Sequence, residues 1–220
     1  KVNINVQDSN LCPRFTGVCI ENISVKESPS WLQNRLKSIG LTPLNNVVDI
    51  TNFVLHEIGQ PLHAYDFDKI TTKSINIKTL SEGTEFTTLD GDTRKLLKTD
   101  LMICDADTPM CIAGVFGGQK HGITNETKSI FLESAYFDPI SVRKTSKRHG
   151  LNTDASFRFE RGIDPEMCIT ALKRAANLIK NLSGGIITSE LQSFNKQLKE
   201  NSQIFLSYET IERTIGESIK

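Results

Sequence analysis

The sequence predicts an α+β fold, with a mixed or antiparallel, sandwich-like β-sheet core and flanking helices. Three observations carry this prediction. Short segments of alternating apolar and polar residues, typical of strands, fill the middle third of the 220 residues, and helical patterns lie on either side. The strands outnumber the helices without regular β-α-β alternation, and no repeat of solenoid length is present.

The first predicted elements are a strand and a short helix. Residues 15–26 carry apolar side chains at strand spacing, with one irregularity. A helix follows, with Ser28 as its cap, Pro29 at its first position and Gly40 after its last turn. Three apolar residues are expected on its buried face: Leu32, Leu36 and Ile39.

A longer helix is predicted over residues 45–58. Its apolar residues recur at helical spacing: Val47, Ile50, Val54 and Ile58. Gly59 ends the helix and Pro61 prevents its continuation, so residues 59–66, GQPLHAYD, read as a loop.

The middle third reads as mostly β. Asp90 and Gly91 indicate a hairpin within EFTTLDGDTRKLL. In KSIFLESA, residues 128–135, the period of two places Phe131 and Glu133 on one face. The other strands of this region are expected in SINIKTL, LMICD and MCIAGVFGG.

The last third returns to helix. Asp164 as cap, Pro165 at the first position and the pair Gly184 and Gly185 at the end predict one long helix. Its buried stripe is expected to contain Ile169, Leu172, Ala176 and Ile179. A strand over 185–193, a polar linker over 195–201 and a new helix in SYETIERTIG follow.

Composition excludes several classes of protein. Lys plus Arg and Asp plus Glu number 26 each, so any nucleic-acid contact should be local. No apolar run is long enough to span a membrane. The five cysteines are scattered and form no C-x-x-C pair, which argues against a disulfide framework or a structural zinc site and favours the reducing cytoplasm. Without an initiator Met or a signal peptide, the chain is expected to be a piece of a longer polypeptide.

His63 is the first candidate site residue. It could be a buried structural residue, a metal ligand together with Asp66, or a group directed into a pocket. No second set of ligands accompanies the pair, so no metal site is predicted. If the loop after the helix folds back, Asn52 and His63 face one space.

A glycine-rich turn and an acidic strand residue are further candidates. Gly114, Gly117 and Gly118 in IAGVFGG either form a simple turn or bring backbone N–H groups against a ligand. Glu133 lies in an apolar strand, where a carboxylate needs a partner. That partner is either an arginine, in a structural ion pair, or a ligand hydroxyl or amine.

Residues 141–162 hold a local excess of positive charge. The basic residues are Arg143, Lys144, Lys147, Arg148, Arg158 and Arg161, against only Asp154 and Glu160. Such a run is either a solvated face or a site for a few phosphates of a single-stranded nucleic-acid end.

Taken together, the motifs resemble those of a known family. NNVVDITNFVLHEIGQPLHAYDFDKI, LDGDTRKL, CIAGVFGG, SIFLESAYFDP and TDASFRFERGIDP occur in an order and spacing similar to the beta subunit of bacterial phenylalanyl-tRNA synthetase. The resemblance covers residues 1–194 and falls on the editing domain, the third-and-fourth-module region. Residues 195–220 resemble a linker and the truncated start of the following module.

The resemblance implies hydrolysis of tyrosine wrongly esterified to tRNA(Phe). It implies a pocket with Asn52 and His63 as catalytic residues and with four substrate-binding positions: Gly114, Gly117, Glu133 and Ala155. It also implies tRNA contacts at Arg143, Lys144, Lys147 and Arg148. The fragment would need no cofactor, whereas ATP and Mg²⁺ would serve the alpha subunit of the full heterotetramer. The alternative is a non-catalytic tRNA-binding or subunit-packing module.

Physical reasoning supports the pocket that the resemblance implies. Phenylalanine would leave a buried Glu133 unpaired, whereas the tyrosine hydroxyl would satisfy it. An aminoacyl ester is already activated, so positioned water suffices, and His63 could orient that water or the terminal ribose without being an obligatory general base. The ribose hydroxyl of the substrate could assist, since no Ser or Cys nucleophile with a paired base is evident.

Overall fold

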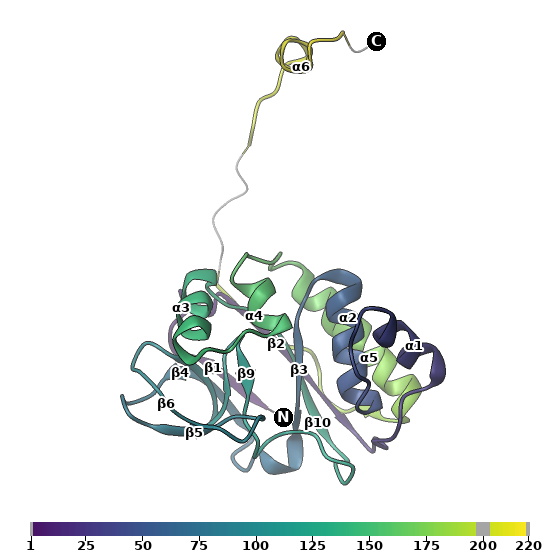
Figure 1. Cartoon of the computed structure of the whole chain (residues 1–220), viewed down its shortest axis with the longest axis vertical. Helices are drawn as coiled ribbons and strands as arrows, with labels where there is room; N and C mark the ends of the chain where they lie inside the picture. The colour runs from purple at the N-terminus through teal and green to yellow at the C-terminus, as the bar shows by residue number, and fades with distance from the viewer. Residues whose placement is uncertain (1, 197–202, 219–220) are drawn as a thin grey trace.

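The computed structural model describes residues 2–196 and 203–218 and confirms the α+β class. Two sheets and a layer of helices form the body of the molecule (Figure 1). Helices cover one face of the central sheet, and the second sheet covers the other, so two hydrophobic cores flank the central sheet. The sandwich-like core that the sequence predicts is therefore present.

The central sheet is antiparallel, in the order β11-β2-β10-β3, with β12 also paired to β2. Its strands are β2 (Arg14–Glu21), β3 (Leu62–Asp66), β10 (Ile130–Tyr136), β11 (Ile186–Ile187) and β12 (Gln192–Asn195). The period of two predicted for β10 is confirmed: Phe131 packs between the sheets, whereas Ile130 and Leu132 pack against the helices.

The second sheet is mixed, in the order β1-β4-β7-β8-β9, and only its β1–β4 pair is parallel. Its strands are β1 (Asn3–Val6), β4 (Ser74–Thr79), β7 (Leu101–Asp105), β8 (Thr108–Ile112) and β9 (Phe116–Gly117). The predicted hairpin is the separate pair β5 (Glu85–Thr87) and β6 (Thr93–Lys95), with Gly91 at positive φ.

Three helices form the outer layer: α1 (Ser30–Ser38), α2 (Asn46–Ile58) and α5 (Met167–Ser183). Helix α2 matches its prediction, because the Asn45 side chain accepts hydrogen bonds from two backbone N–H groups and Gly59 ends the helix at a φ of 78°. Leu32 and Leu36 of α1 are buried as expected.

Two details of α1 differ from the prediction. Pro29, not Ser28, occupies the position before the first turn, and the Ser28 hydroxyl instead donates to Asp49 at 2.5 Å. Ile39 is 51% exposed, because α1 ends at Ser38 and leaves it on the surface.

The loop predicted over residues 59–66 is wrong. Residues 62–66 form β3, the edge strand of the central sheet, paired with β10. Pro61 lies just before the strand, where its missing N–H does no harm to the ladder. A short 3₁₀ helix, η1 (Phe67–Lys69), follows.

Strand and helix ends also differ elsewhere. The strand predicted over residues 15–26 ends at Glu21, since Asn22 has a φ of 59°. Asp164 and Pro165 form a turn before α5, so neither caps nor starts it, and Ile169 is only half-buried. The strand predicted over 185–193 is two short strands, β11 and β12.

Two helices were not predicted: α3 (Pro139–His149) and α4 (Asp154–Phe159). Asp138 and Thr153 cap them, and Gly150 ends α3 at a φ of 65°. Both overlap the basic segment, residues 141–162, whose positive charges do not by themselves indicate a helix.

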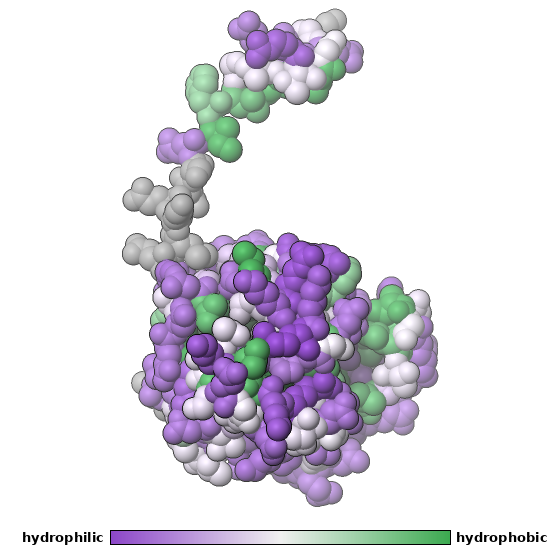
Figure 2. Space-filling view, turned by 60° about the vertical axis from the view of Figure 1, so that its left-hand side comes forward, coloured by the Kyte–Doolittle hydropathy of each residue, from purple (hydrophilic) through white to green (hydrophobic). Residues whose placement is uncertain are grey.

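The helix predicted in SYETIERTIG is α6 (Tyr208–Ile215), capped by Ser207. It stands apart from the body in Figure 1, and Figure 2 shows hydrophobic surface leading up to it. Residues 197–201 of the predicted linker lie outside the described residues. None of the helices described in residues 2–196 and 203–218 is long and apolar enough to cross a membrane.

Candidate functional site

One cavity of about 640 Å³ lies among α2, β3, the β8–β9 turn, β10 and α4. The six pocket positions expected from the sequence all line it: Asn52, His63, Gly114, Gly117, Glu133 and Ala155. The fold therefore brings together residues from five separate segments of the chain.

The pairing of β3 with β10 places two ionisable residues of the cavity, His63 and Glu133, side by side. His63 and Glu133 are direct partners in the antiparallel register, so their side chains emerge on the same face. The strand conformation of residues 62–66 sets this geometry. A loop would have left the direction of His63 open.

Glu133 is 5% exposed, and its Oε2 accepts a hydrogen bond of 2.7 Å from the Tyr65 hydroxyl. In the described part of the chain no arginine pairs with Glu133, so the structural ion pair considered from the sequence is wrong. Burial raises the pKa of Glu133 to about 7, and the Tyr65 hydrogen bond moderates that rise. The carboxyl therefore titrates near neutral pH.

His63 is half-buried in the cavity wall, and its ring meets the Tyr65 ring edge-on, with centroids 4.5 Å apart. Burial lowers the pKa of His63 to about 4, so the imidazole is neutral at pH 7. Asp66 lies three residues along the strand, on the opposite face, and binds Thr127 and Lys69. No group of three metal-ligating side chains occurs among the described residues.

The glycine-rich turn serves packing at each of its three glycines. A methyl group on Gly117 would lie 2.9 Å from Cε1 of His63, and one on Gly118 would meet the Phe86 ring at 2.6 Å. Gly114 has a φ of 69° and is enclosed by side chains. The N–H of Gly118 is bonded to the Met110 carbonyl, so it is not free for a ligand.

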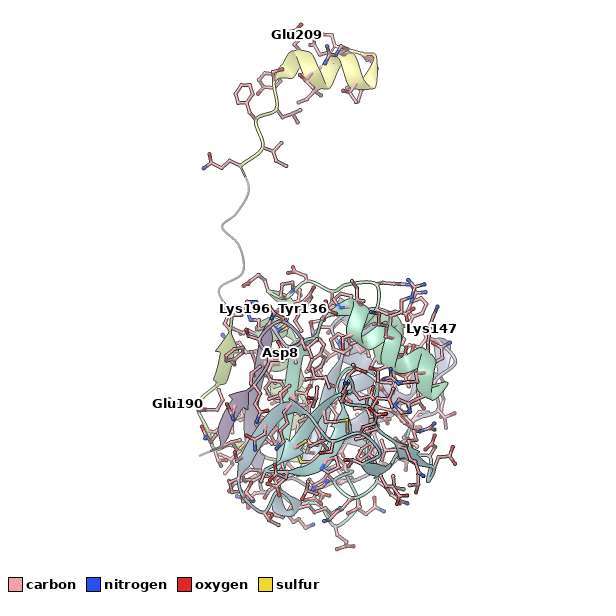
Figure 3. All side chains as sticks on the ribbon, turned by 90° about the vertical axis from the view of Figure 1, so that its left-hand side faces the viewer. Asp8, Tyr136, Lys147, Glu190, Lys196 and Glu209 are labelled. Atoms are coloured by element: carbon pink, nitrogen blue, oxygen red, sulfur yellow. The ribbon has the colours of Figure 1, made fainter. Side chains whose placement is uncertain are left out.

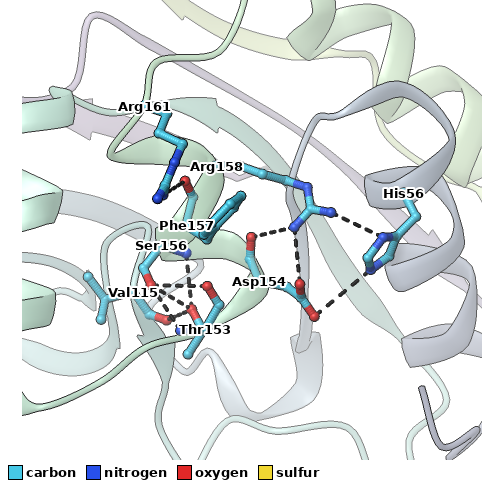
Figure 4. Close-up of polar contacts among 8 residues, drawn as sticks. All are labelled: His56, Val115, Thr153, Asp154, Ser156, Phe157, Arg158 and Arg161. Atoms are coloured by element: carbon cyan, nitrogen blue, oxygen red, sulfur yellow. Dashed lines mark hydrogen bonds and ion pairs between the residues drawn. The ribbon is translucent and has the colours of Figure 1, made fainter. Parts of the chain in front are cut away.

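Helix α4 holds Ala155 at the cavity through a capping box. The Thr153 hydroxyl accepts from the Ser156 N–H and donates to the Val115 carbonyl at 2.9 Å (Figure 4). The second bond ties the start of α4 to the glycine-rich turn. The small side chain of Ala155 is thereby fixed in the wall of the cavity.

A polar cluster joins α2 to α4 beside the cavity (Figure 4). Arg158 donates to Nδ1 of His56 at 3.1 Å and to Oδ1 of Asp154 at 3.1 Å. Burial, and then the Arg158 cation, lowers the pKa of His56. Because Nδ1 accepts this bond, the His56 ring is neutral. Nothing in the local sequence pattern selects His56 as a site residue.

Comparison with known proteins decides the family. The model of the B3/4 domain matches residues 11–184. The chain belongs to the B3/4 domain family. Over 218 residues it is 53% identical to the phenylalanine–tRNA ligase beta subunit of Bacteroides fragilis, and over 221 residues 52% identical to that of Porphyromonas gingivalis. The resemblance to the phenylalanyl-tRNA synthetase beta subunit is thus confirmed.

These alignments cover 99% and 100% of this chain but 27% of each relative, so the chain spans about a quarter of their length. An N-terminal fragment of the phenylalanyl-tRNA synthetase beta-subunit from Pyrococcus horikoshii aligns over the whole chain and 61% of its own, with a TM-score of 0.54 and 15% identity. That likeness shows a shared fold.

The basic residues of this B3/4 domain lie outside the cavity wall. Arg143, Lys144, Lys147 and Arg148 are exposed on α3, and none of them lines the cavity; Figure 3 shows Lys147 on the outer side of that helix. Arg148 pairs with the buried Asp100, which also binds Thr145 and His149. Arg148 thus has a structural partner, which the sequence did not reveal.

Tyr65 is the site residue that sequence reasoning missed. It is fully buried, yet it contacts both Glu133 and His63. Once 62–66 is taken as a strand, the spacing of two between His63 and Tyr65 places them on one face. The loop prediction concealed that signal.

Proposed function

We propose that this B3/4 domain hydrolyses tyrosine wrongly esterified to the phenylalanine tRNA, as an editing domain of phenylalanine–tRNA ligase. The observation that carries the proposal is the convergence of Asn52, His63, Gly117, Glu133 and Ala155 on one cavity with a buried carboxyl group. The cavity has room for an aromatic amino acid together with the ester end of its carrier.

Glu133 supplies the selection in this proposal. Its Oε2 is taken by Tyr65, and Oε1 is left to accept the phenol of a tyrosyl group. Phenylalanine would desolvate the same oxygen without replacing its water. A site built around such an acceptor discriminates far more strongly than an apolar pocket that only admits or excludes one oxygen.

The chemistry that remains is attack of water on an activated ester. A neutral His63 can accept a hydrogen bond from that water or from the terminal ribose, and Asn52 can hold the polar groups of the substrate. Cys111 also lines the cavity, but burial raises the pKa of its thiol, which makes it a poor nucleophile. In this mechanism the ribose hydroxyl of the substrate assists the attack of water on the ester.

We also propose partners, from the beta subunits to which the chain is similar. The exposed charges of Arg143, Lys144 and Lys147 would contact tRNA phosphates near the bound 3′ end. Aminoacylation, with ATP and Mg²⁺, would take place in the alpha subunit, and the whole enzyme would act in the cytoplasm. The domain itself would use no cofactor.

The test is to incubate the chain with purified Tyr-tRNA(Phe) and Phe-tRNA(Phe) and to measure released amino acid. We expect release of tyrosine and little release of phenylalanine. A correctly folded chain that binds the tRNA and releases neither would favour the non-catalytic alternative. Tyr-tRNA without the free neighbouring ribose hydroxyl tests the assisting group: an unchanged rate removes it from the mechanism.

The role of Glu133 has its own test in the same assay. We expect Glu133→Ala to keep the fold and to lose the preference for tyrosine over phenylalanine, because the acceptor is gone. An unchanged preference would remove Glu133 from recognition. Circular dichroism of the variant checks the fold.

A further inference from the structure

Tyr65 contacts two ionisable residues of the cavity, Glu133 and His63. Its hydroxyl donates to Oε2 of Glu133 at 2.7 Å, and its ring packs edge-on against His63. The Phe131 ring lies beside it, with centroids 6.4 Å apart, and the whole side chain is buried. Tyr65 is therefore held in one orientation by its surroundings.

The Tyr65 hydroxyl has a single hydrogen, which it donates in a hydrogen bond to Glu133. The two carboxyl oxygens of Glu133 are thereby made unequal: Oε2 has a fixed donor, and Oε1 has none among the described residues although Glu133 lines the cavity. Only Oε1 is left for a ligand, and the hydrogen bond at Oε2 sets the direction in which Oε1 points.

We infer that Tyr65 is a positioning residue for specificity, which holds Glu133 so that Oε1 alone accepts the hydroxyl of a bound phenol. This inference rests on the proposed function and deepens it. Tyr65 itself does not touch the ester.

The protonation of the pair supports this role. Burial, together with neighbouring Cys111 and Glu133, raises the pKa of Tyr65, so its hydroxyl keeps its proton and can donate at neutral pH. The same hydrogen bond lowers the pKa of Glu133 and so favours the ionised form. An ionised carboxylate accepts a phenol hydrogen bond more strongly than a neutral carboxylic acid does.

The experiment compares the wild-type chain with Tyr65→Phe and with Tyr136→Phe as a matched control. Tyr136 lies at the end of β10, outside the cavity lining. Its substitution by phenylalanine removes the same hydroxyl group as Tyr65→Phe does. Hydrolysis of Tyr-tRNA(Phe) and Phe-tRNA(Phe) is measured from pH 5.5 to 8.5. Carbon-13 spectra of the labelled glutamate carboxyls report the titration of Glu133, assigned with Glu133→Gln.

In the wild type and in Tyr136→Phe, we expect selectivity for tyrosine to rise as Glu133 ionises, with a midpoint at about pH 7. In Tyr65→Phe, selectivity should fall roughly tenfold, since one hydrogen bond to a charged group is lost. Its midpoint and the pKa of Glu133 should both move upward.

Three outcomes would overturn the inference. The first is a Tyr65→Phe variant with wild-type selectivity and midpoint. The second is an equal loss of activity on both substrates with a lowered melting temperature, which marks a purely structural role. The third is an unchanged carbon-13 titration of Glu133 in Tyr65→Phe. The carbon-13 titration does not need turnover. A wild type that releases no tyrosine would therefore contradict the proposed function, while the titration would still show whether Tyr65 sets the state of Glu133.

Discussion

Glu133 and His63 are opposed across two strands, and burial acts on both in the same way by favouring the uncharged form. Glu133 keeps its proton up to a pH of about 7, and His63 stays neutral down to a pH of about 4. Between these values the pair carries no net charge. Above a pH of about 7 Glu133 ionises while His63 stays neutral, so the pair then carries one negative charge.

The raised pKa of Glu133 predicts a pH dependence of folding stability. Between pH 4.5 and 7 the folded protein keeps a proton that the unfolded chain has released, so this contribution is complete at low pH and is lost as the pH rises. Glu133→Gln removes the titration. We expect the variant to gain roughly 3 kcal/mol relative to wild type between pH 4.5 and pH 8.

Urea unfolding of both proteins at several pH values measures this difference. His63 contributes with the opposite sign, because the unfolded chain takes up its proton first as the pH falls below about 6.5. That term is common to both proteins and cancels in the comparison. A difference that stays constant with pH would contradict the raised pKa.

Gly117 gives a second prediction at the scale of one residue. A methyl group there would lie 2.9 Å from the His63 ring and 3.1 Å from Leu89, so Gly117→Ala should push the imidazole into the cavity. We expect tyrosine release to fall roughly tenfold or more, because misplaced groups lose effective molarity. Gly122→Ala, in the same wall, is the matched control: its methyl group would lie 3.3 Å from Cδ2 of Leu89, with no His63 atom among its nearest contacts, so tyrosine release should change much less.

Individual site residues were predictable to different degrees. The cavity positions followed from the resemblance of motifs, and the structure places all of them together. Tyr65 and His56 did not, because their importance comes from partners 68 and 102 residues away in the chain. No local pattern records such a partner.

At the scale of elements, the capping box of α4 carries a prediction. Thr153→Ala removes both the cap and the bond to Val115, so we expect a loss of about 1 kcal/mol of stability. Tyrosine release should also fall, because Ala155 is no longer anchored. Ser207→Ala removes a cap from α6, away from the cavity, and should leave the release rate unchanged.

The contact between β2 and β10 gives a second prediction at the scale of elements, about folding stability. A methyl group on Gly17 would meet Cζ of Phe131 at 2.2 Å, so Gly17→Ala should cost about 1–3 kcal/mol of stability. The double variant Gly17→Ala, Phe131→Leu makes room for the methyl group. Chemical denaturation should show the double variant less destabilised than the two single changes added together. Simple additivity would contradict this packing.

Elements were predictable where residues at their own ends define them. Helix α2 has Asn45 and Gly59, and both ends were found. Strand β3 was not, because its identity comes from pairing with β10 and not from its own five residues. Helices α3 and α4 had readable caps in Asp138 and Thr153, which the charge of the segment obscured.

At the scale of the whole molecule, the body and α6 are separable. Among the described elements, none packs extensively against α6, and Phe205 beside it is 95% exposed. A chain that ends at Lys196 keeps β12 and the bond from the Lys196 N–H to the Pro13 carbonyl. We expect it to keep the melting temperature and tyrosine release of the full chain.

A chain that ends at Glu190 is the contrasting variant. It loses β12, which pairs with β2 over four residues, and should melt at a lower temperature. If the chain ending at Lys196 also melts early, then α6 contributes to the body and the two are not separable. Calorimetry of the three chains makes the comparison.

The sandwich was predictable because alternating patterns specify which face of a strand is buried. The order of the strands was not, since β2 pairs with β10, β11 and β12, all of which come much later in the chain. The division at residue 194 stays a prediction, and β12 continues to Asn195.

The wall of the cavity is assembled from residues as far apart as Leu44 and Phe159. During synthesis, a ribosome must therefore release most of the domain before His63 can meet Glu133. If the domain hydrolyses the ester as proposed, nascent chains would lack this activity until that late closure, because contacts of such long sequence separation form slowly. Tyrosine release would then serve as a clock for the completion of folding, reporting the native state and none of its precursors.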